Sequence, residues 1–113
     1  MTTKSLIITN SRYSEIVDIK SIVFFIANGS YCEIVLNDKR KITASKNLHW
    51  FEEKTANGFF FRVHKSYLIN MLFIAKIFHN EFKIELRNGI VIPISRTKKH
   101  DFWQKLESIG LCA

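Results

Sequence analysis

The chain has 113 residues, which is enough for one domain with a single, modest hydrophobic core. Hydrophobic residues make up 47% of the sequence and charged residues 24%, so the composition excludes an intrinsically disordered chain. The 17 Lys and Arg residues outnumber the 10 Asp and Glu residues, and the net charge is +7. This excess favours an anionic partner, which leaves nucleic acid, an anionic membrane surface and an acidic protein as candidate classes.

The first part of the chain predicts short strands joined by polar turns. An Asn10-Ser11 turn separates the first two apolar stretches, and Asn28-Gly29-Ser30 separates the next two. Asn-Gly favours tight type I′ hairpin turns, because both residues tolerate a positive φ. The predicted strands are residues 6–9, 15–17, 22–26, 31–36 and 40–43.

A short helix is predicted over residues 46–54, with Ser45 as its N-cap. Leu48 and Phe51 lie one turn apart, so one face of this helix should enter the core. The three consecutive phenylalanines at 59–61 then predict a strand that enters the core. The basic and polar residues after them mark where that strand reaches the surface.

A hairpin is predicted further along the chain, around Asn88-Gly89. This turn lies between residues 82–86 and 90–92, and the first of these stretches alternates apolar and polar residues. Pro93 cannot donate a backbone hydrogen bond, which places its strand at a sheet edge or at a bulge.

A second helix is predicted near the C-terminus, with Thr97 as its N-cap. Its apolar residues follow helical spacing: Phe102, Trp103, Leu106 and Ile109. The pattern as a whole predicts a mainly β protein with two short helices. We expect residues 1–113 to form a single domain, with its core at about residues 5–107.

No arrangement of residues indicates catalysis. The four histidines are scattered, none pairs with a cysteine or carboxylate at ligand spacing, and there is no glycine-rich phosphate loop. Cys32 and Cys112 form no CxxC motif, and Cys32 lies in a predicted strand, so we expect a buried free thiol. We therefore expect no enzyme activity, no metal site and no cofactor.

Three segments carry the most specific pattern in the chain. The first in the chain is Phe24-Phe25-Ile26-Ala27-Asn28-Gly29-Ser30-Tyr31. The second, directly after the three phenylalanines, is Arg62-Val63-His64-Lys65-Ser66-Tyr67-Leu68-Ile69-Asn70, and the third is Pro93-Ile94-Ser95-Arg96. In this order they resemble the LytTR family, the DNA-binding output domain of LytR/AlgR-type bacterial response regulators. The resemblance covers about residues 5–106.

The resemblance implies an elongated antiparallel β-strand and hairpin domain that reads double-stranded DNA with loop residues, not with a recognition helix. Carried onto this chain, the family's base contacts fall on Tyr31, Lys65 and Arg96. Arg96 is best suited to base reading, because a guanidinium can donate two hydrogen bonds to guanine O6 and N7. Lys65 is a single point charge and can grip a phosphate instead. Ser30 or Asn28 can serve in place of Tyr31.

Cationic and polar residues near these segments are candidate phosphate contacts, since Lys and Arg neutralise phosphates and release condensed counterions. A solvated surface is the ordinary explanation for the basic run at 39–41. The other two basic clusters lie in family-like segments: Arg62 with Lys65, and Arg96 with Lys98, Lys99 and His100. The candidate phosphate contacts are Arg62, His64, Lys98, Lys99, Lys41, Arg40, Ser30 and Asn28.

The sequence therefore predicts sequence-specific binding of double-stranded DNA in bacterial transcription regulation, in the cytoplasm. The alternative is a basic β protein-interaction module that docks an acidic or membrane-bound regulatory partner. No apolar run is long enough to span a bilayer, so no membrane insertion is expected. The chain leaves no room for a receiver domain, so we expect an excised output domain or a stand-alone regulator that is switched by a partner or by its own concentration. We expect a monomer in free solution that pairs on repeated half-sites of DNA.

Overall fold

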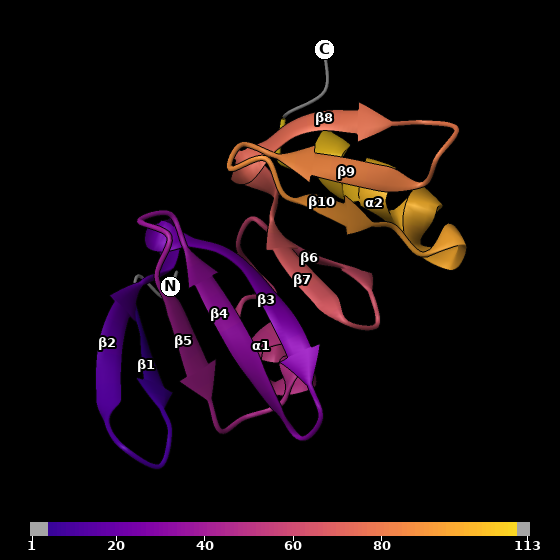
Figure 1. Ribbon diagram of the computed structural model, residues 1–113. Helices are drawn as coiled ribbons and strands as arrows, with labels where there is room; N and C mark the ends of the chain where they lie inside the picture. Colours follow the sequence, from indigo (N-terminus) through magenta and orange to yellow (C-terminus); the bar gives the residue numbers. More distant parts are fainter. Residues whose placement is uncertain (1–4, 111–113) are drawn as a thin grey trace.

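The computed structural model describes residues 5–110 and shows a mainly β protein with two short α-helices (Figure 1). Its extents of 42 × 30 × 24 Å make it elongated. The strands form three sheets in which all paired neighbours are antiparallel. The predicted fold class is confirmed.

Five strands form the central sheet, in the order β5-β4-β3-β7-β6. Their bounds are β3 Ile22–Asn28, β4 Tyr31–Leu36, β5 Lys41–Ala44, β6 Phe60–His64 and β7 Tyr67–Asn70. The N-terminal sheet is a hairpin of β1 Ser5–Thr9 and β2 Ser14–Asp18. The third sheet, in the order β10-β9-β8, contains β8 Ile74–Phe78, β9 Lys83–Leu86 and β10 Val91–Pro93. The helices are α1 Leu48–Lys54 and α2 Lys99–Ser108, and the 3-10 turns are η1 Ile19–Ser21, η2 Met71–Phe73 and η3 Arg96–Lys98.

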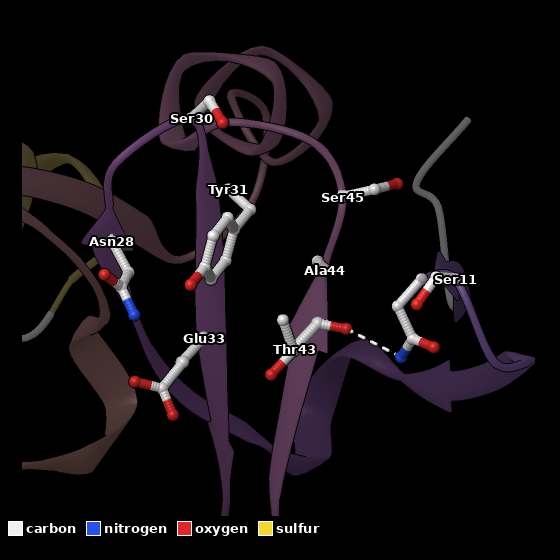
Figure 2. A pocket seen from close by; sticks show the side chains of 9 residues that line it. Ser11, Asn28, Ser30, Tyr31, Glu33, Thr43, Ala44 and Ser45 are labelled. Carbon is white, nitrogen blue, oxygen red and sulfur yellow. Dashed lines mark hydrogen bonds between the residues drawn. The ribbon is translucent and has the colours of Figure 1, made fainter.

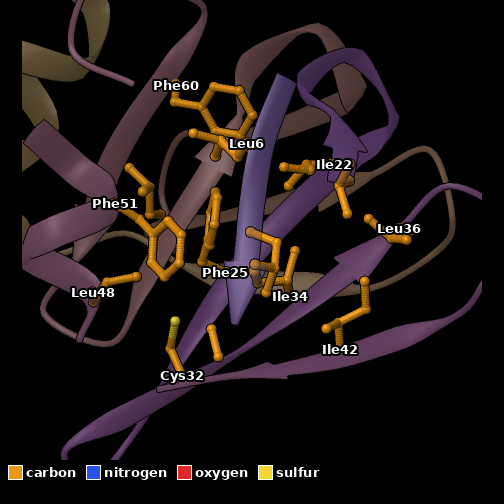
Figure 3. Close-up of a cluster of buried hydrophobic side chains, with 14 residues drawn as sticks. Leu6, Ile22, Phe25, Cys32, Ile34, Leu36, Ile42, Leu48, Phe51 and Phe60 are labelled. Atoms are coloured by element: carbon orange, nitrogen blue, oxygen red, sulfur yellow. The ribbon is translucent and has the colours of Figure 1, made fainter. Parts of the chain in front are cut away.

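Both faces of the central sheet are covered, because successive side chains of a strand point to opposite sides. On β3, Phe25 packs in a cluster with α1 and the N-terminal hairpin, whereas its neighbour Phe24 packs in a cluster with the third sheet and α2. Phe25 stacks on Phe51 of α1, with 4.8 Å between the ring centroids (Figure 3). A shift of β3 by one residue would move each of its side chains to the opposite face of the sheet. The burial of both faces therefore specifies the register of the strands and, with it, the positions of the turns.

The predicted hairpins are present, but their turn type differs from the prediction. Asn28 pairs directly with Tyr31, so the loop between β3 and β4 consists of Gly29 and Ser30 alone. Gly29 has a φ of +67°, while neither of its neighbours has a positive φ. The same holds at Asn88-Gly89, where only the glycine, at +87°, is left-handed. A type I′ turn at these sites is therefore wrong; glycine at the first loop position between β3 and β4 is typical of type II′.

The predicted N-caps of both helices are wrong. The N-cap of α1 is Asn47, whose side-chain oxygen accepts a hydrogen bond from the Trp50 N–H at 3.0 Å. Ser45 instead lies in a bend between β5 and α1, and its N–H donates to the last carbonyl of β1 at 2.8 Å. Thr97 lies inside the 3-10 turn η3, and its hydroxyl lies 3.0 Å from the hydroxyl of Ser95. No side-chain cap hydrogen bond precedes α2.

The edge position predicted from Pro93 is confirmed. β10 is an outer strand of the third sheet, and Pro93 is its last residue, opposite Lys83 on β9. Beyond this point the Ser95 N–H donates to the carbonyl of Val63 on β6 at 2.7 Å. The chain therefore leaves the third sheet and docks on the end of the central sheet, just before α2 begins.

Cys32 is fully buried and forms no disulfide, so the predicted buried free thiol is confirmed. Burial raises the pKa of this thiol to about 12, because an apolar environment disfavours the thiolate. In a Cys112→Ser variant, we expect native Cys32 to react with iodoacetamide at pH 8 about 100-fold or more slowly than it does in urea, since only the thiolate reacts. Mass spectrometry of the alkylated protein measures both rates, and equal rates would contradict the burial of this residue.

Candidate nucleic-acid interface

Three segments that lie far apart in the sequence meet at one edge of the molecule. At the end of β3, the N–H of Ala27 donates to the carbonyl of Ser66 in the β6–β7 turn at 2.8 Å. At the end of β6, the carbonyl of Val63 accepts from the N–H of Ser95 at 2.7 Å. The β3–β4 turn, the β6–β7 turn and residues 95–98 are therefore held side by side by backbone hydrogen bonds. We call this the loop edge.

Each of the three predicted base contacts lies on one segment of the loop edge. Tyr31 is the first residue of β4, Lys65 is in the β6–β7 turn, and Arg96 is the first residue of η3. All three side chains belong to exposed residues. Asn28 and Ser30 are also exposed, beside Tyr31, while Lys98 is half-buried in η3.

Side chains of the β6–β7 turn brace the turn itself. Arg62 binds Glu52 of α1 through Nη1 at 3.1 Å and donates from Nη2 to the carbonyl of Lys65 at 2.6 Å. The Nδ1 of His64 accepts the Ser66 N–H at 3.1 Å, so a neutral imidazole carries its proton on Nε2. Arg62 and His64 therefore fix the backbone that presents Lys65.

Tyr31 borders an open polar cleft of about 510 Å³ between the β3–β4 hairpin and the β1–β2 turn (Figure 2). Asn10 fixes the far side of this cleft: its side-chain oxygen accepts from the N–H groups of Arg12 and Tyr13, and its Nδ2 donates to the carbonyl of Thr43 at 2.9 Å. The exposed Arg12 is thereby held on a turn that borders the same cleft. The other lining residues are Ser11, Asn28, Ser30, Glu33, Ala44 and Ser45.

The third segment of the loop edge packs on the β8–β9 turn. The guanidinium carbon of Arg96 lies 4.7 Å from the centroid of the Phe82 ring, and Nζ of Lys99 lies 4.6 Å from the same centroid. Lys99 also donates to the carbonyl of His79 at 3.0 Å, and the imidazole of His79 stacks on Trp103 of α2. The Phe82 ring thus contacts two side chains that are predicted to bind DNA, those of Arg96 and Lys99.

Arg40 and Lys41 do not lie at the loop edge. β4 begins at the loop edge with Tyr31 and runs away from it for six residues, which is about 17 Å, before the turn that carries Arg40. Arg40 is also bound to two carboxylates, those of Glu15 at 2.7 Å and Asp38 at 3.1 Å. Its backbone N–H, with its guanidinium, holds the pKa of the Asp38 carboxyl below the ordinary value. The basic run at 39–41 belongs to the opposite end of the sheet.

Two residues of this region carry no signal in the sequence. Arg12 follows a polar turn and belongs to no motif, and only the packing of the N-terminal hairpin brings its turn to the cleft that Tyr31 borders. Phe82 continues an alternating apolar pattern, so it reads as part of a strand. In the structure Phe82 has a φ of +51° and ends the β8–β9 turn.

The loop edge offers exposed cations, amides and hydroxyls on turns that extend from a β scaffold. These are the donors that contact phosphates and base edges. Within residues 5–110, no group of three His, Cys, Asp or Glu side chains is placed to hold a metal ion, and no helix is long and apolar enough to cross a membrane. The fold and the loop edge define a β-rich nucleic-acid-binding domain.

Comparison with known proteins identifies the family. The family model for the LytTr DNA-binding domain matches residues 13–107. Over 85 residues the chain is 31% identical to the sensory transduction protein LytT of Bacillus subtilis (strain 168), a match that covers 73% of this chain and 35% of that protein. A solved LytTr DNA-binding domain, from a Bacillus cereus protein assigned as a methyl-accepting/DNA response regulator, has the same fold. The TM-score is 0.78 at 20% identity, over 92% of this chain and 97% of that one.

The chain belongs to the LytTr DNA-binding domain family, and the predicted resemblance is confirmed. DNA is therefore its partner, and its general role is DNA binding in transcription regulation. The matched part spans about a third of the length of LytT, so that relative has other regions with no counterpart in the alignment.

Proposed function

We propose that this domain reads double-stranded DNA in a sequence-specific manner through the loop edge, with base contacts from Arg96, Lys65 and Tyr31. The observation that supports this most directly is the pair of backbone hydrogen bonds that unites their three segments. Three side chains can contact defined positions on one duplex only if the segments that carry them are fixed relative to one another.

The composition of α2 supports loops as the reading elements. Phe102 and Leu106 fix one face of this helix in the core, which leaves the opposite face for any partner. Asp101 and Glu107 are exposed there, and a carboxylate opposite a phosphate backbone is repulsive. A recognition helix would need a basic or neutral face.

Phosphate contacts are proposed for the residues that surround the three base contacts. Arg62 retains N–H groups beyond the two that bind within the protein, and Nε2 of His64 is a free donor in the neutral ring. Arg40 and Lys41 contribute only long-range attraction, since they lie at the opposite end of the sheet. The proposed phosphate contacts at the loop edge are Asn28, Ser30, Arg62, His64, Lys98 and Lys99.

The biological setting is proposed from the family and from the named relative. We infer a cytoplasmic bacterial regulator in which residues 1–113 act as one domain, with the core at about 5–107. Because LytT is named as a sensory transduction protein and is matched over only 35% of its length, we propose that a receiver domain or other regulatory partner supplies the signal. The alternative, a protein-interaction module, is less well supported, because two of the three basic clusters gather at one edge with Tyr31.

Arg96→Ala should lower affinity for the preferred duplex about 5- to 150-fold, which corresponds to about 1–3 kcal/mol, and relax the preference at one base pair. The reason is the loss of a side chain that can donate two hydrogen bonds to one guanine. The preferred duplex is first selected from a randomised pool by the wild-type protein. Fluorescence anisotropy with that duplex and its single-base variants then measures the change.

Lys41→Ala is the matched control, because it removes one cation from the end of the sheet opposite the loop edge. It should change affinity for preferred and random duplexes equally, and only slightly. If Arg96→Ala also weakened both duplexes equally, Arg96 would be a phosphate contact. A wild-type protein that selects no sequence from the pool would overturn the proposed function.

A further inference from the structure

We propose that Phe82, on the β8–β9 turn, is a specificity-determining positioning residue that holds the guanidinium of Arg96 in its base-reading orientation. The inference rests on the proposed function and adds a fourth turn to the loop edge. It is carried by the conformation of Phe82, by the cations on its ring, and by the way in which Arg96 differs from other arginines of the protein.

Phe82 has a backbone conformation that a bulky residue rarely adopts. Its φ is +51°, in the left-handed region that favours glycine and asparagine, and it is one of two such non-glycine residues between residues 5 and 110. Its carbonyl accepts the N–H of Ile94 at 2.7 Å, which ties the turn to the strand that leads into Arg96. Such conformations persist where surrounding contacts hold them, and they cluster at functional sites. Here the conformation places the ring under the η3 segment.

The contact with Phe82 leaves Arg96 competent to bind an anion or a base. A ring covers only one side of a guanidinium, and the N–H donors on its other sides remain available to a partner. Arg96 is exposed, and its side chain forms no hydrogen bond or ion pair within residues 5–110. By contrast, Arg40 and Arg62 each form an ion pair with a carboxylate of the protein, which offsets part of the charge that they offer to DNA. Phe82 orients Arg96 without neutralising it.

Lys99 adds a second cation to the same ring. Its Nζ lies 4.6 Å from the ring centroid and is fixed by a hydrogen bond to the carbonyl of His79. Two like charges held by one ring repel each other, and an anion placed between or beside them relieves that repulsion. A phosphate next to the base pair that Arg96 reads is such an anion. The ring therefore couples one base contact to one backbone contact.

The central test removes the ring without straining the turn. Phe82→Asn suits this purpose, because asparagine tolerates a positive φ better than most residues. Phe82→Tyr is the matched control that keeps an aromatic face. With the selected duplex and its single-base variants, Phe82→Asn should reduce discrimination at the base pair read by Arg96 by about 2- to 10-fold. Phe82→Tyr should retain the wild-type discrimination.

A double-mutant cycle separates positioning from other roles. In an Arg96→Ala background, Phe82→Asn should cause no further loss of discrimination at that base pair, because the residue it positions is gone. An equal loss in both backgrounds would mean that Phe82 touches DNA itself, and it would overturn the proposal. Unchanged discrimination in Phe82→Asn would overturn it as well.

The outcome can be told apart from failure of the proposed function. If wild-type protein selects a sequence and Arg96→Ala relaxes it, the proposed function stands, whatever the Phe82 variants do. Thermal melts show whether Phe82→Asn is folded; if it is not, Phe82→Gly, which adopts a positive φ freely, takes its place with the same expected result. Retained discrimination in a folded Phe82→Gly would overturn the positioning role.

Discussion

Raising the salt concentration from 50 to 200 mM should weaken duplex binding roughly 250- to 1,000-fold, if about 4–6 phosphates are neutralised on binding. This number of contacts is what the loop edge can supply with its exposed and half-buried cations. The plot of log K against log[salt] should then have a slope of roughly −4 to −5. The effect is large because each neutralised phosphate releases condensed counterions, whose dilution drives binding at low salt.

Fluorescence anisotropy with a random duplex measures this slope without knowledge of the preferred sequence. Lys98→Ala should make the slope shallower by about 1, because it removes one of the proposed phosphate contacts at the loop edge. Lys41→Ala removes the same charge from the far end and should leave the slope close to that of the wild type. Binding that does not respond to salt would be incompatible with a DNA interface built from lysine and arginine.

The architecture could be predicted from sequence because its signals are local. Strands that alternate about a buried face, the paired turn residues Asn28-Gly29 and Asn88-Gly89, and the apolar spacing of Leu48 and Phe51 each depend on a few neighbouring residues. Pro93 placed its strand at an edge for an equally local reason, the absence of an N–H. These elements appear in the structure close to their expected bounds.

Details that depend on distant parts of the chain could not be predicted. Ser45 has the chemistry of an N-cap, but its N–H is hydrogen-bonded to β1, more than thirty residues earlier, and Asn47 caps the helix instead. The turn type at Gly29 follows from the register of β3 on β4, which a dipeptide does not reveal.

The residues of the loop edge also divide into those that a local pattern predicts and those that only the tertiary structure reveals. The basic run at 39–41 and the motif around Lys65 look alike as sequences, yet the direction of β4 sends the first to the opposite end of the sheet. Phe82 is the opposite case, a residue of strand-like pattern that tertiary hydrogen bonding places beneath Arg96. Motif resemblance selects Arg96 and Lys65, whereas contact geometry is needed to find what holds them.

Inserting five base pairs between two half-sites should abolish joint occupancy by two copies of this domain. One copy presents three proposed base contacts, too few for a unique site, so useful specificity should require two copies on repeated half-sites. Half-sites on one face of the duplex are separated by whole turns of about 10–10.5 bp, and an insertion of half a turn rotates one copy to the opposite face. Contacts between the two copies would then be lost.

The free protein should be monomeric, because its sequence carries no heptad seam that would pair two copies in solution. Sedimentation velocity without DNA checks this, and gel shifts with the spaced duplexes resolve singly and doubly bound species. An insertion of ten base pairs is the control, since it restores the facing of the half-sites and should recover much of the joint occupancy. Full double occupancy with the five-base-pair insertion would show that the copies bind independently, and each domain would then have to draw its specificity from the loop edge alone.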